Sequence, residues 1–184
     1  TIIETGYNNF KEAIKIRDSL LKNSKQYFSP MQFSNPLNTQ CHYETTAPEI
    51  YGHVVTEMRP LKWSAFVHGS GTGGTMMGVK KYIDNLQLNV KCVLTTPEES
   101  AETHGIQGIN DGADFLLDKT LMDEVIKVKT ADAISRMKKF WKETGILVGI
   151  SSGANILAAE KYLKNHDPKG IIITILCDRG ERYL

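Results

Sequence analysis

The fold of this chain is decided by the stretch WSAFVHGSGTGGT, residues 63–75. Residues 63–69 are mostly apolar and lack helical periodicity, which predicts a buried strand. Glycine and threonine dominate the next residues, and a helical pattern then runs from about residue 73 to residue 84. Glycines allow a sharp turn that points several N–H groups at one place, and a helix N-terminus adds a positive dipole end. The stretch therefore predicts a strand-to-helix turn suited to a phosphate group.

Two well-known phosphate motifs do not match this turn. No Lys-Ser or Lys-Thr pair follows at the offset of a P-loop. The spacing of a dinucleotide fingerprint also fails, and no acidic partner for a ribose is evident. On this loop alone, a glycine-rich turn that binds no ligand remains an alternative.

The rest of the chain alternates apolar strands with amphipathic helices. Strands are predicted at 89–95, 123–128 and 170–176. Helices are predicted at 8–21, at 130–144 with Thr130 as its cap, and from the turn 149–153 to residue 163. A short helix is predicted to begin near Pro48, with Thr46 as its cap. Residues 34–46 are predicted to be a loop. This order predicts an α/β fold: an open, twisted, mostly parallel sheet with helices on both faces.

Composition excludes several classes of protein. The 184 residues carry 22 Lys and Arg against 21 Asp and Glu, a net charge of +1, which argues against a nucleic-acid partner. No apolar run approaches the roughly 18 residues that cross a bilayer, and residues 1–10 do not resemble a signal peptide. The three cysteines form no CxxC pair and the histidines are scattered, so no metal site is expected. Cys92 and Cys177 are expected to be buried in a reducing cytoplasm.

Three further segments contain candidate functional residues. Gly149-Ile150-Ser151-Ser152-Gly153-Ala154 could aim a hydroxyl at the carboxyl ends of the strands, although serines at a helix start are usually caps. The three glycines of residues 104–112 mark a loop that approaches something closely, and His104 in it is expected to be structural. Residues 32–36, QFSNP, are either a simple boundary or place Gln32 and Ser34 near a polar ligand.

Taken in order, these motifs and the ending CDRGERYL (177–184) resemble the cysteine synthase (O-acetylserine sulfhydrylase) family. That family belongs to the fold type II enzymes, whose cofactor is pyridoxal 5′-phosphate and whose fold is that of the tryptophan synthase β-subunit. The ending is similar to the B branch of the family. The phosphate loop and the Gln-Gly-Ile segment are similar to the A branch.

The resemblance implies a role for individual residues. The cofactor phosphate would be held by Gly71, Thr72, Gly73, Gly74 and Thr75. The Ser151 hydroxyl would meet the pyridine nitrogen, and a neutral partner there makes the ring a weaker electron sink. Gln32 would lie near the substrate carboxylate, and Gly108 would line the mouth of the cleft.

The resemblance also exposes an absence. The family's Schiff-base lysine and its Ser-Gly-Asn-Thr-Gly substrate loop have no match here, so no catalytic residue is assigned to this chain. Residues 1–33 are expected to be the tail of the small domain and 34–184 most of the large domain, incomplete on the N-terminal side. The chain alone is expected to hold the phosphate but to be inactive. An exposed sheet edge and apolar face should make it dimerise, bind its missing segment or aggregate.

The predicted function is the C-terminal portion of a cytoplasmic cysteine synthase, which replaces the acetoxy group of O-acetylserine with sulfide to give cysteine and acetate. When complete, it would be a homodimer without a nucleic-acid or membrane partner. One alternative is a sibling enzyme, either cystathionine β-synthase-like or an O-phosphoserine sulfhydrylase. Another is a non-catalytic remnant whose cleft mouth binds the C-terminal tail of a serine acetyltransferase.

Overall fold

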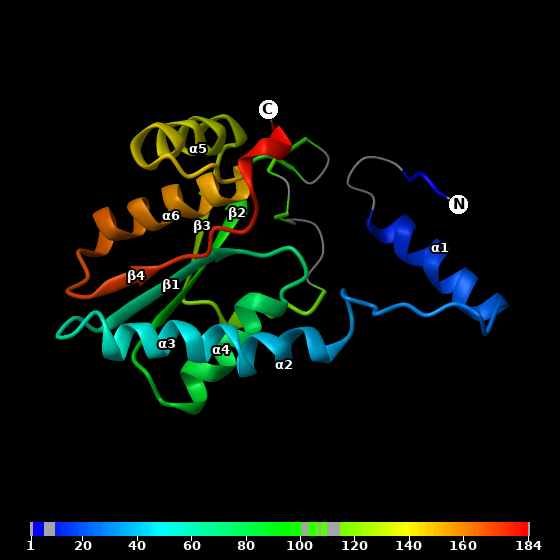
Figure 1. Cartoon of the computed structure of the whole chain (residues 1–184), viewed down its shortest axis with the longest axis horizontal. Helices are drawn as coiled ribbons and strands as arrows, with labels where there is room; N and C mark the ends of the chain where they lie inside the picture. The colour runs from blue at the N-terminus through cyan, green and yellow to red at the C-terminus, as the bar shows by residue number, and fades with distance from the viewer. Residues whose placement is uncertain (1, 6–9, 101–102, 107, 110–114, 184) are drawn as a thin grey trace.

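A parallel sheet forms the centre of the computed structural model, which describes residues 2–5, 10–100, 103–106, 108–109 and 115–183 (Figure 1). In this part of the chain the strands are β1 (Trp63–Gly69), β2 (Lys91–Pro97), β3 (Glu124–Val128) and β4 (Ile171–Ile173). Their order across the sheet is β3-β2-β1-β4, and every neighbouring pair is parallel. The predicted α/β class and parallel sheet are confirmed.

Helices cover both faces of the sheet. On one face lie α5 (Thr130–Thr144) and α6 (Ile150–His166), and on the other lie α3 (Thr46–Thr56) and α4 (Gly74–Asn85) (Figure 1). Ala65, Phe66 and Val67 are all fully buried because neighbouring residues of β1 pack into the cores on opposite faces. This two-sided burial explains why the strand is continuously apolar rather than alternating.

The segment predicted to be a loop is instead helix α2 (Pro36–Glu44). It begins correctly for a helix, because the Asn35 side chain accepts a hydrogen bond from Leu37 N and Pro36 occupies the first turn. The helix has no fully buried residue. Its polar side chains lie against the glycines of α4. The sequence therefore has no apolar stripe here that would predict a helix.

Three predicted boundaries are also corrected. Helix α3 begins at Thr46 with Thr45 as its N-cap, and α5 begins after Lys129 rather than being capped by Thr130. The Thr130 hydroxyl is engaged elsewhere, where it accepts a hydrogen bond from Gly105 N. Strand β4 stops at Ile173, since the chain then leaves the sheet and runs toward α6.

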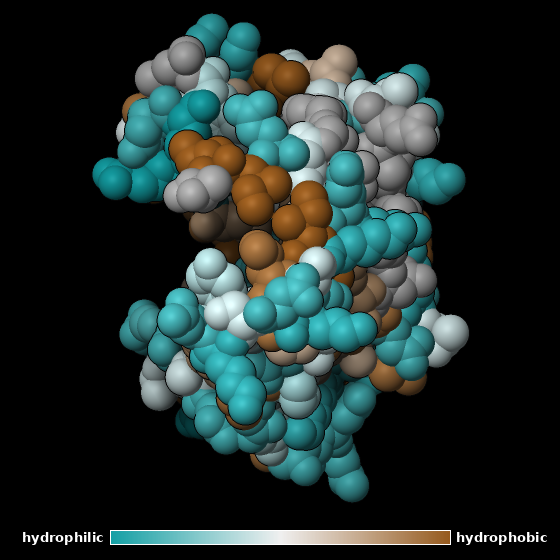
Figure 2. Space-filling model, turned by 90° about the vertical axis from the view of Figure 1, so that its right-hand side faces the viewer, coloured by the Kyte–Doolittle hydropathy of each residue, from teal (hydrophilic) through white to brown (hydrophobic). Residues whose placement is uncertain are grey.

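Helix α1 (Phe10–Asn23) stands apart from the sheet (Figure 1). Its predicted start at residue 8 lies outside the described residues. Phe10 contacts Phe33, whose ring lies 4.5 Å from that of Phe115 between centroids. On the side of the molecule where α1 lies, apolar side chains gather around a hollow (Figure 2). The domain boundary at residue 33 stays a prediction.

Two expectations concern the environment of the chain. Among the described helices, none is long and apolar enough to cross a membrane. Cys92 is buried as expected, but Cys177 is exposed. The strand that was predicted to bury Cys177 ends at Ile173, so Cys177 lies beyond the sheet.

Candidate functional site

The glycine loop between β1 and α4 has free backbone donors. Within the described residues, the N–H groups of Gly71, Thr72 and Gly73 donate to no backbone carbonyl. Gly73 has φ 95°, a left-handed conformation, and a Cβ there would lie 2.4 Å from Leu117 N. A Cβ on Gly71 would lie 2.8 Å from Gly108 O. The loop therefore requires glycine at both positions and leaves its N–H groups available to an anion.

Asn38 ties the loop to the segment before α2. Its Nδ2 donates to Thr72 Oγ1 at 3.0 Å and to Gln32 O at 2.9 Å. Thr72 Oγ1 also accepts from Gly74 N at 3.3 Å. Sequence reasoning missed Asn38 because it lies in the stretch predicted to be a loop. The available signal was Asn35 followed by Pro36, a capping residue and a proline suited to the first turn of a helix.

Two residues of α2 contact the far side of the loop. A Cβ on Gly74 would lie 2.0 Å from Asn38 Oδ1, so this glycine serves the packing of α2. Thr75 Oγ1 lies 3.1 Å from His42 Nε2. Burial lowers the pKa of His42, which favours a neutral imidazole at this contact.

A cavity of ≈ 210 Å³ lies where the glycine loop meets α6. Most of the predicted site residues line it, namely Gly71, Thr72, Gly73, Thr75, Gly108 and Ser151. His68, Asn155 and Cys177 line it as well, although sequence reasoning assigned them no role. Gln32 is exposed and instead lines a separate cavity of ≈ 330 Å³ against α1.

The two serines at the start of α6 have different surroundings. Ser151 is 3% exposed and lines the cavity. Ser152 is fully buried, and its hydroxyl accepts a hydrogen bond from Cys177 N at 3.0 Å. Desolvation raises the pKa of the Cys177 thiol even though the residue as a whole is exposed. Ser151 therefore lines the cavity, whereas the Ser152 hydroxyl anchors the C-terminal segment.

His104 does not line the cavity at the glycine loop. It is buried, and its Nδ1 accepts a hydrogen bond from Ile106 N at 3.3 Å. Gly105 N donates to Thr130 Oγ1, while Thr130 N donates to Glu99 Oε1. These contacts fix residues 103–106 on the start of α5, in agreement with a structural histidine. Residues 107 and 110–112 of this motif lie outside the described residues.

A second cavity, of ≈ 540 Å³, adjoins the first and shares Gly108, Ser151 and Cys177 with it. Its other side is formed by Asp178, Arg182 and Tyr183. Tyr183 OH donates to Asp178 Oδ2 at 2.5 Å, and burial together with this carboxylate raises the pKa of Tyr183 to about 12. The closing motif of the sequence thus forms a wall of the site.

A larger cavity, of ≈ 620 Å³, lies at the opposite end of the sheet and includes Arg59 and Trp63 but none of the predicted site residues. Ligands of open α/β sheets bind at the carboxyl ends of the strands. The smaller cavity at the glycine loop is therefore the better candidate site.

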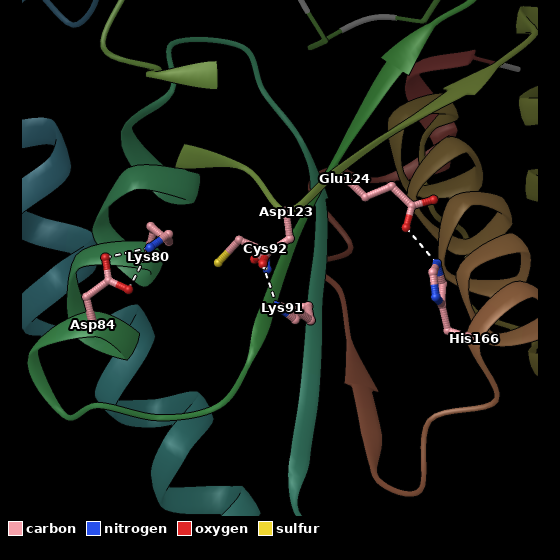
Figure 3. Close-up of polar contacts among 7 residues, drawn as sticks. All are labelled: Lys80, Asp84, Lys91, Cys92, Asp123, Glu124 and His166. Atoms are coloured by element: carbon pink, nitrogen blue, oxygen red, sulfur yellow. Dashed lines mark hydrogen bonds and ion pairs between the residues drawn. The ribbon is translucent and has the colours of Figure 1, made fainter. Parts of the chain in front are cut away.

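The ion pairs of Figure 3 lie along the sheet and helices rather than in the site cavities. Lys91 Nζ lies 2.8 Å from Asp123 Oδ1, and Asp123 Oδ2 accepts from Cys92 N (Figure 3). His166 bonds Glu124 at 2.7 Å. Burial raises the pKa of Cys92 to about 12, so its thiol stays neutral. In the described part of the chain, no cluster of three or more His, Cys, Asp or Glu could hold a metal ion.

The site fits a phosphorylated pyridine. The free loop N–H groups and the N-terminus of α4 suit a phosphate, and a Cβ on Gly71 would project to within 2.8 Å of Gly108 O. Ser151 supplies a neutral hydroxyl across the same cavity. No lysine is among the described residues that line either site cavity.

Comparison with known proteins finds relatives that match over the whole chain. The chain is 36% identical to a cysteine synthase of Staphylococcus aureus over 193 residues and 38% identical to one of Buchnera aphidicola over 204 residues. Both matches cover 100% of this chain, which spans 60% and 61% of those relatives.

Solved structures show the same fold. A hydrogen sulfide-producing enzyme of Fusobacterium nucleatum matches with a TM-score of 0.87 at 34% identity, over 100% of this chain and 63% of that one. An O-acetylserine dependent cystathionine β-synthase of Helicobacter pylori matches with a TM-score of 0.86 at 30% identity, over 100% of this chain and 60% of that one. Residues 1–178 also match the family described as pyridoxal-phosphate dependent enzyme. The chain therefore belongs to the pyridoxal-phosphate-dependent enzyme family, with cysteine synthases among its relatives.

Proposed function

We propose that this chain supplies the cofactor-phosphate side of a cysteine synthase that replaces the acetoxy group of O-acetylserine with sulfide. The observation that carries the proposal is the single cavity of ≈ 210 Å³ shared by the glycine loop and Ser151. The loop N–H groups hold the phosphate, and Ser151 faces the pyridine nitrogen. When bound, pyridoxal phosphate supplies an electron-accepting ring for the reacting carbon of the substrate.

The residues of this chain bind and orient rather than transfer protons. We infer that the Schiff-base lysine comes from a segment outside these 184 residues, since no lysine is among the described residues lining the two site cavities. A covalent partner of this kind must be positioned on a supported scaffold, which a distant surface lysine does not provide. The complete enzyme would be a homodimer that carries both parts.

Equilibrium dialysis of the purified chain against pyridoxal phosphate tests the proposal. Reversible binding is expected, together with the absence of a covalent adduct after borohydride reduction. Ser151→Ala should weaken binding, whereas Ser100→Ala, an exposed serine outside both site cavities, should not. A reduced adduct on one of this chain's lysines, or no binding at all, would contradict the proposal.

The choice of substrate is a separate question, because the solved relatives include a cystathionine β-synthase as well as cysteine synthases. We favour O-acetylserine with sulfide over homocysteine or O-phosphoserine, on the cysteine synthase relatives that match the whole chain. Reconstituting the chain with the N-terminal part of such a relative, and assaying each activated serine with each sulfur donor, separates these activities.

A binding function is favoured by the second cavity. This cavity of ≈ 540 Å³ is lined by Gly108 and Arg182. The Arg182 side chain is 72% exposed and offers a cation to a peptide carboxylate. This is the place where a serine acetyltransferase tail would bind. Titration with a peptide that ends in isoleucine should show binding that Arg182→Gln weakens, and a peptide with an amidated C-terminus is the matched control.

A further inference from the structure

A buried amide ties the glycine loop to α6. Asn155 is fully buried and lies four residues after Ser151, so both side chains are on one face of the helix. Its Oδ1 accepts from Gly69 N at 2.8 Å, and its Nδ2 donates to Ile175 O at 3.2 Å. One side chain thus joins the end of β1, the helix that carries Ser151 and the segment after β4.

The orientation of the Asn155 amide follows from these contacts. A backbone N–H can bond only to the amide oxygen, so Oδ1 must face Gly69 and Nδ2 must face the other partners. Nδ2 lies 3.2 Å from His68 Nδ1. His68 is 6% exposed, and burial, helped by nearby His42, lowers its pKa to about 4. In the neutral ring, Nδ1 therefore accepts this hydrogen bond and Nε2 carries the proton.

The end of β1 requires glycine at position 69, chiefly because the Ile109 side chain packs against it, with the Asn155 amide close by. A Cβ on Gly69 would lie 3.2 Å from Asn155 Oδ1 and 2.3 Å from Ile109 Cδ1. Asn155 is surrounded on α6 by residues of an apolar core, among them Ala154 and Ala158. A buried amide in such surroundings is costly unless its hydrogen bonds are made. Its contacts lie where strand β1 becomes the phosphate loop.

We propose that Asn155 is the positioning residue of the phosphate loop, which it holds through Gly69 N–H while fixing His68 in the Nε2-protonated tautomer. The proposal rests on the function proposed above for this loop. It concerns the phosphate end of the ligand, because the anchored N–H lies at the entrance to residues 70–75. The pyridine end would contact Ser151 instead. The position of Ser151 is set by the backbone of α6 and does not depend on the side chain of Asn155.

The test compares two ligands that differ only in the phosphate, pyridoxal phosphate and pyridoxal, by equilibrium dialysis of the full chain. Asn155→Ala should lower the affinity for pyridoxal phosphate by about tenfold, the loss expected for one such hydrogen bond, and leave the affinity for pyridoxal nearly unchanged. Thr95→Val is the matched control, because Thr95 is equally buried and its hydroxyl has no partner within the described residues. An unchanged ratio of the two affinities in Asn155→Ala would overturn the proposal.

The wild-type protein and the tautomer of His68 provide two further tests. If the wild-type chain binds both ligands equally, the proposed phosphate site has failed, whereas a wild-type preference that survives in Asn155→Ala refutes only the role of Asn155. Nitrogen-15 NMR of the wild type at pH 7 should show His68 protonated at Nε2, and protonation at Nδ1 would overturn the proposal without any variant. In Asn155→Asp, the carboxylate should raise the pKa of His68 above its wild-type value.

Discussion

His68 is a weak base enclosed at the end of β1, and its protonation is linked to folding. Burial holds its pKa at about 4 in the folded chain against 6.5 for an exposed imidazole. The folded state therefore binds fewer protons than the unfolded state between these values. The resulting stabilisation is fully present above pH 6.5 and is lost as the pH falls from 6.5 toward 4.

The free energy of unfolding should fall by roughly 3 kcal/mol from this residue over that range. Urea denaturation at pH 7.0 and pH 4.5 measures the difference. In His68→Gln, the fall should be smaller than in the wild type. His53→Gln is the control, because His53 is exposed on α3. Equal pH dependence in all three proteins would refute the assignment to His68.

Gly73 and Gly145 separate backbone strain from steric conflict. Both have positive φ, 95° and 74°, but a Cβ on Gly145 meets nothing within 4 Å while one on Gly73 would strike the backbone of Leu117. Gly145→Ala should cost about 1 kcal/mol of unfolding free energy, the strain of a left-handed alanine. Gly73→Ala should cost clearly more and also weaken phosphate binding. Equal costs by urea denaturation would contradict the contact with Leu117.

At the scale of elements, the packing of α2 on α4 reverses the ordinary effect of glycine in a helix. A Cβ on Gly78 would lie 2.6 Å from His42 Cβ and 2.7 Å from Thr39 O. Gly78→Ala should therefore destabilise the chain, although alanine is the better helix former. Gly52→Ala in α3, where nothing lies within 4 Å, should stabilise it by about 0.5–1 kcal/mol. Thermal unfolding of the two variants should shift in opposite directions, and parallel shifts would contradict this packing.

The same contrast explains which elements could be predicted from the sequence. β1 and β2 are buried on both faces, so their apolar runs were unambiguous, and Gly145 marked the end of α5. Helix α2 escaped detection because its side chains, such as Asn38 and His42, make polar contacts with the loop rather than entering a core. The motifs singled out Ser151 and Gly108, which line one cavity in the structure, whereas Asn155 had no signal in isolation, since its partners lie 20 or more residues away.

At the scale of the whole molecule, two surfaces of the described residues are open to contact with other protein. β4, like β3 at the other end of the strand order, is an edge strand, and its residues are half-buried. The N-terminal arm, whose described residues are 2–5 and 10–33, carries exposed apolar side chains. In this arm they are Ile2, Ile3, Phe10, Leu20, Tyr27, Phe28 and Met31. The relatives that match the entire chain are longer by the remaining 40% or so of their length. Surfaces of this kind normally face other protein.

The chain on its own should therefore self-associate in a concentration-dependent way. Light scattering at increasing concentration should show a weight-average mass above 20.6 kDa, which falls toward that value on dilution. Phe28→Lys should shift the equilibrium toward monomer, because Phe28 is 89% exposed on the arm and a charge there opposes burial of its apolar surface. Leu37→Lys is the matched control, since Leu37 is 68% exposed but lies on α2. A wild type that remains monomeric at high concentration would show that neither surface needs a partner.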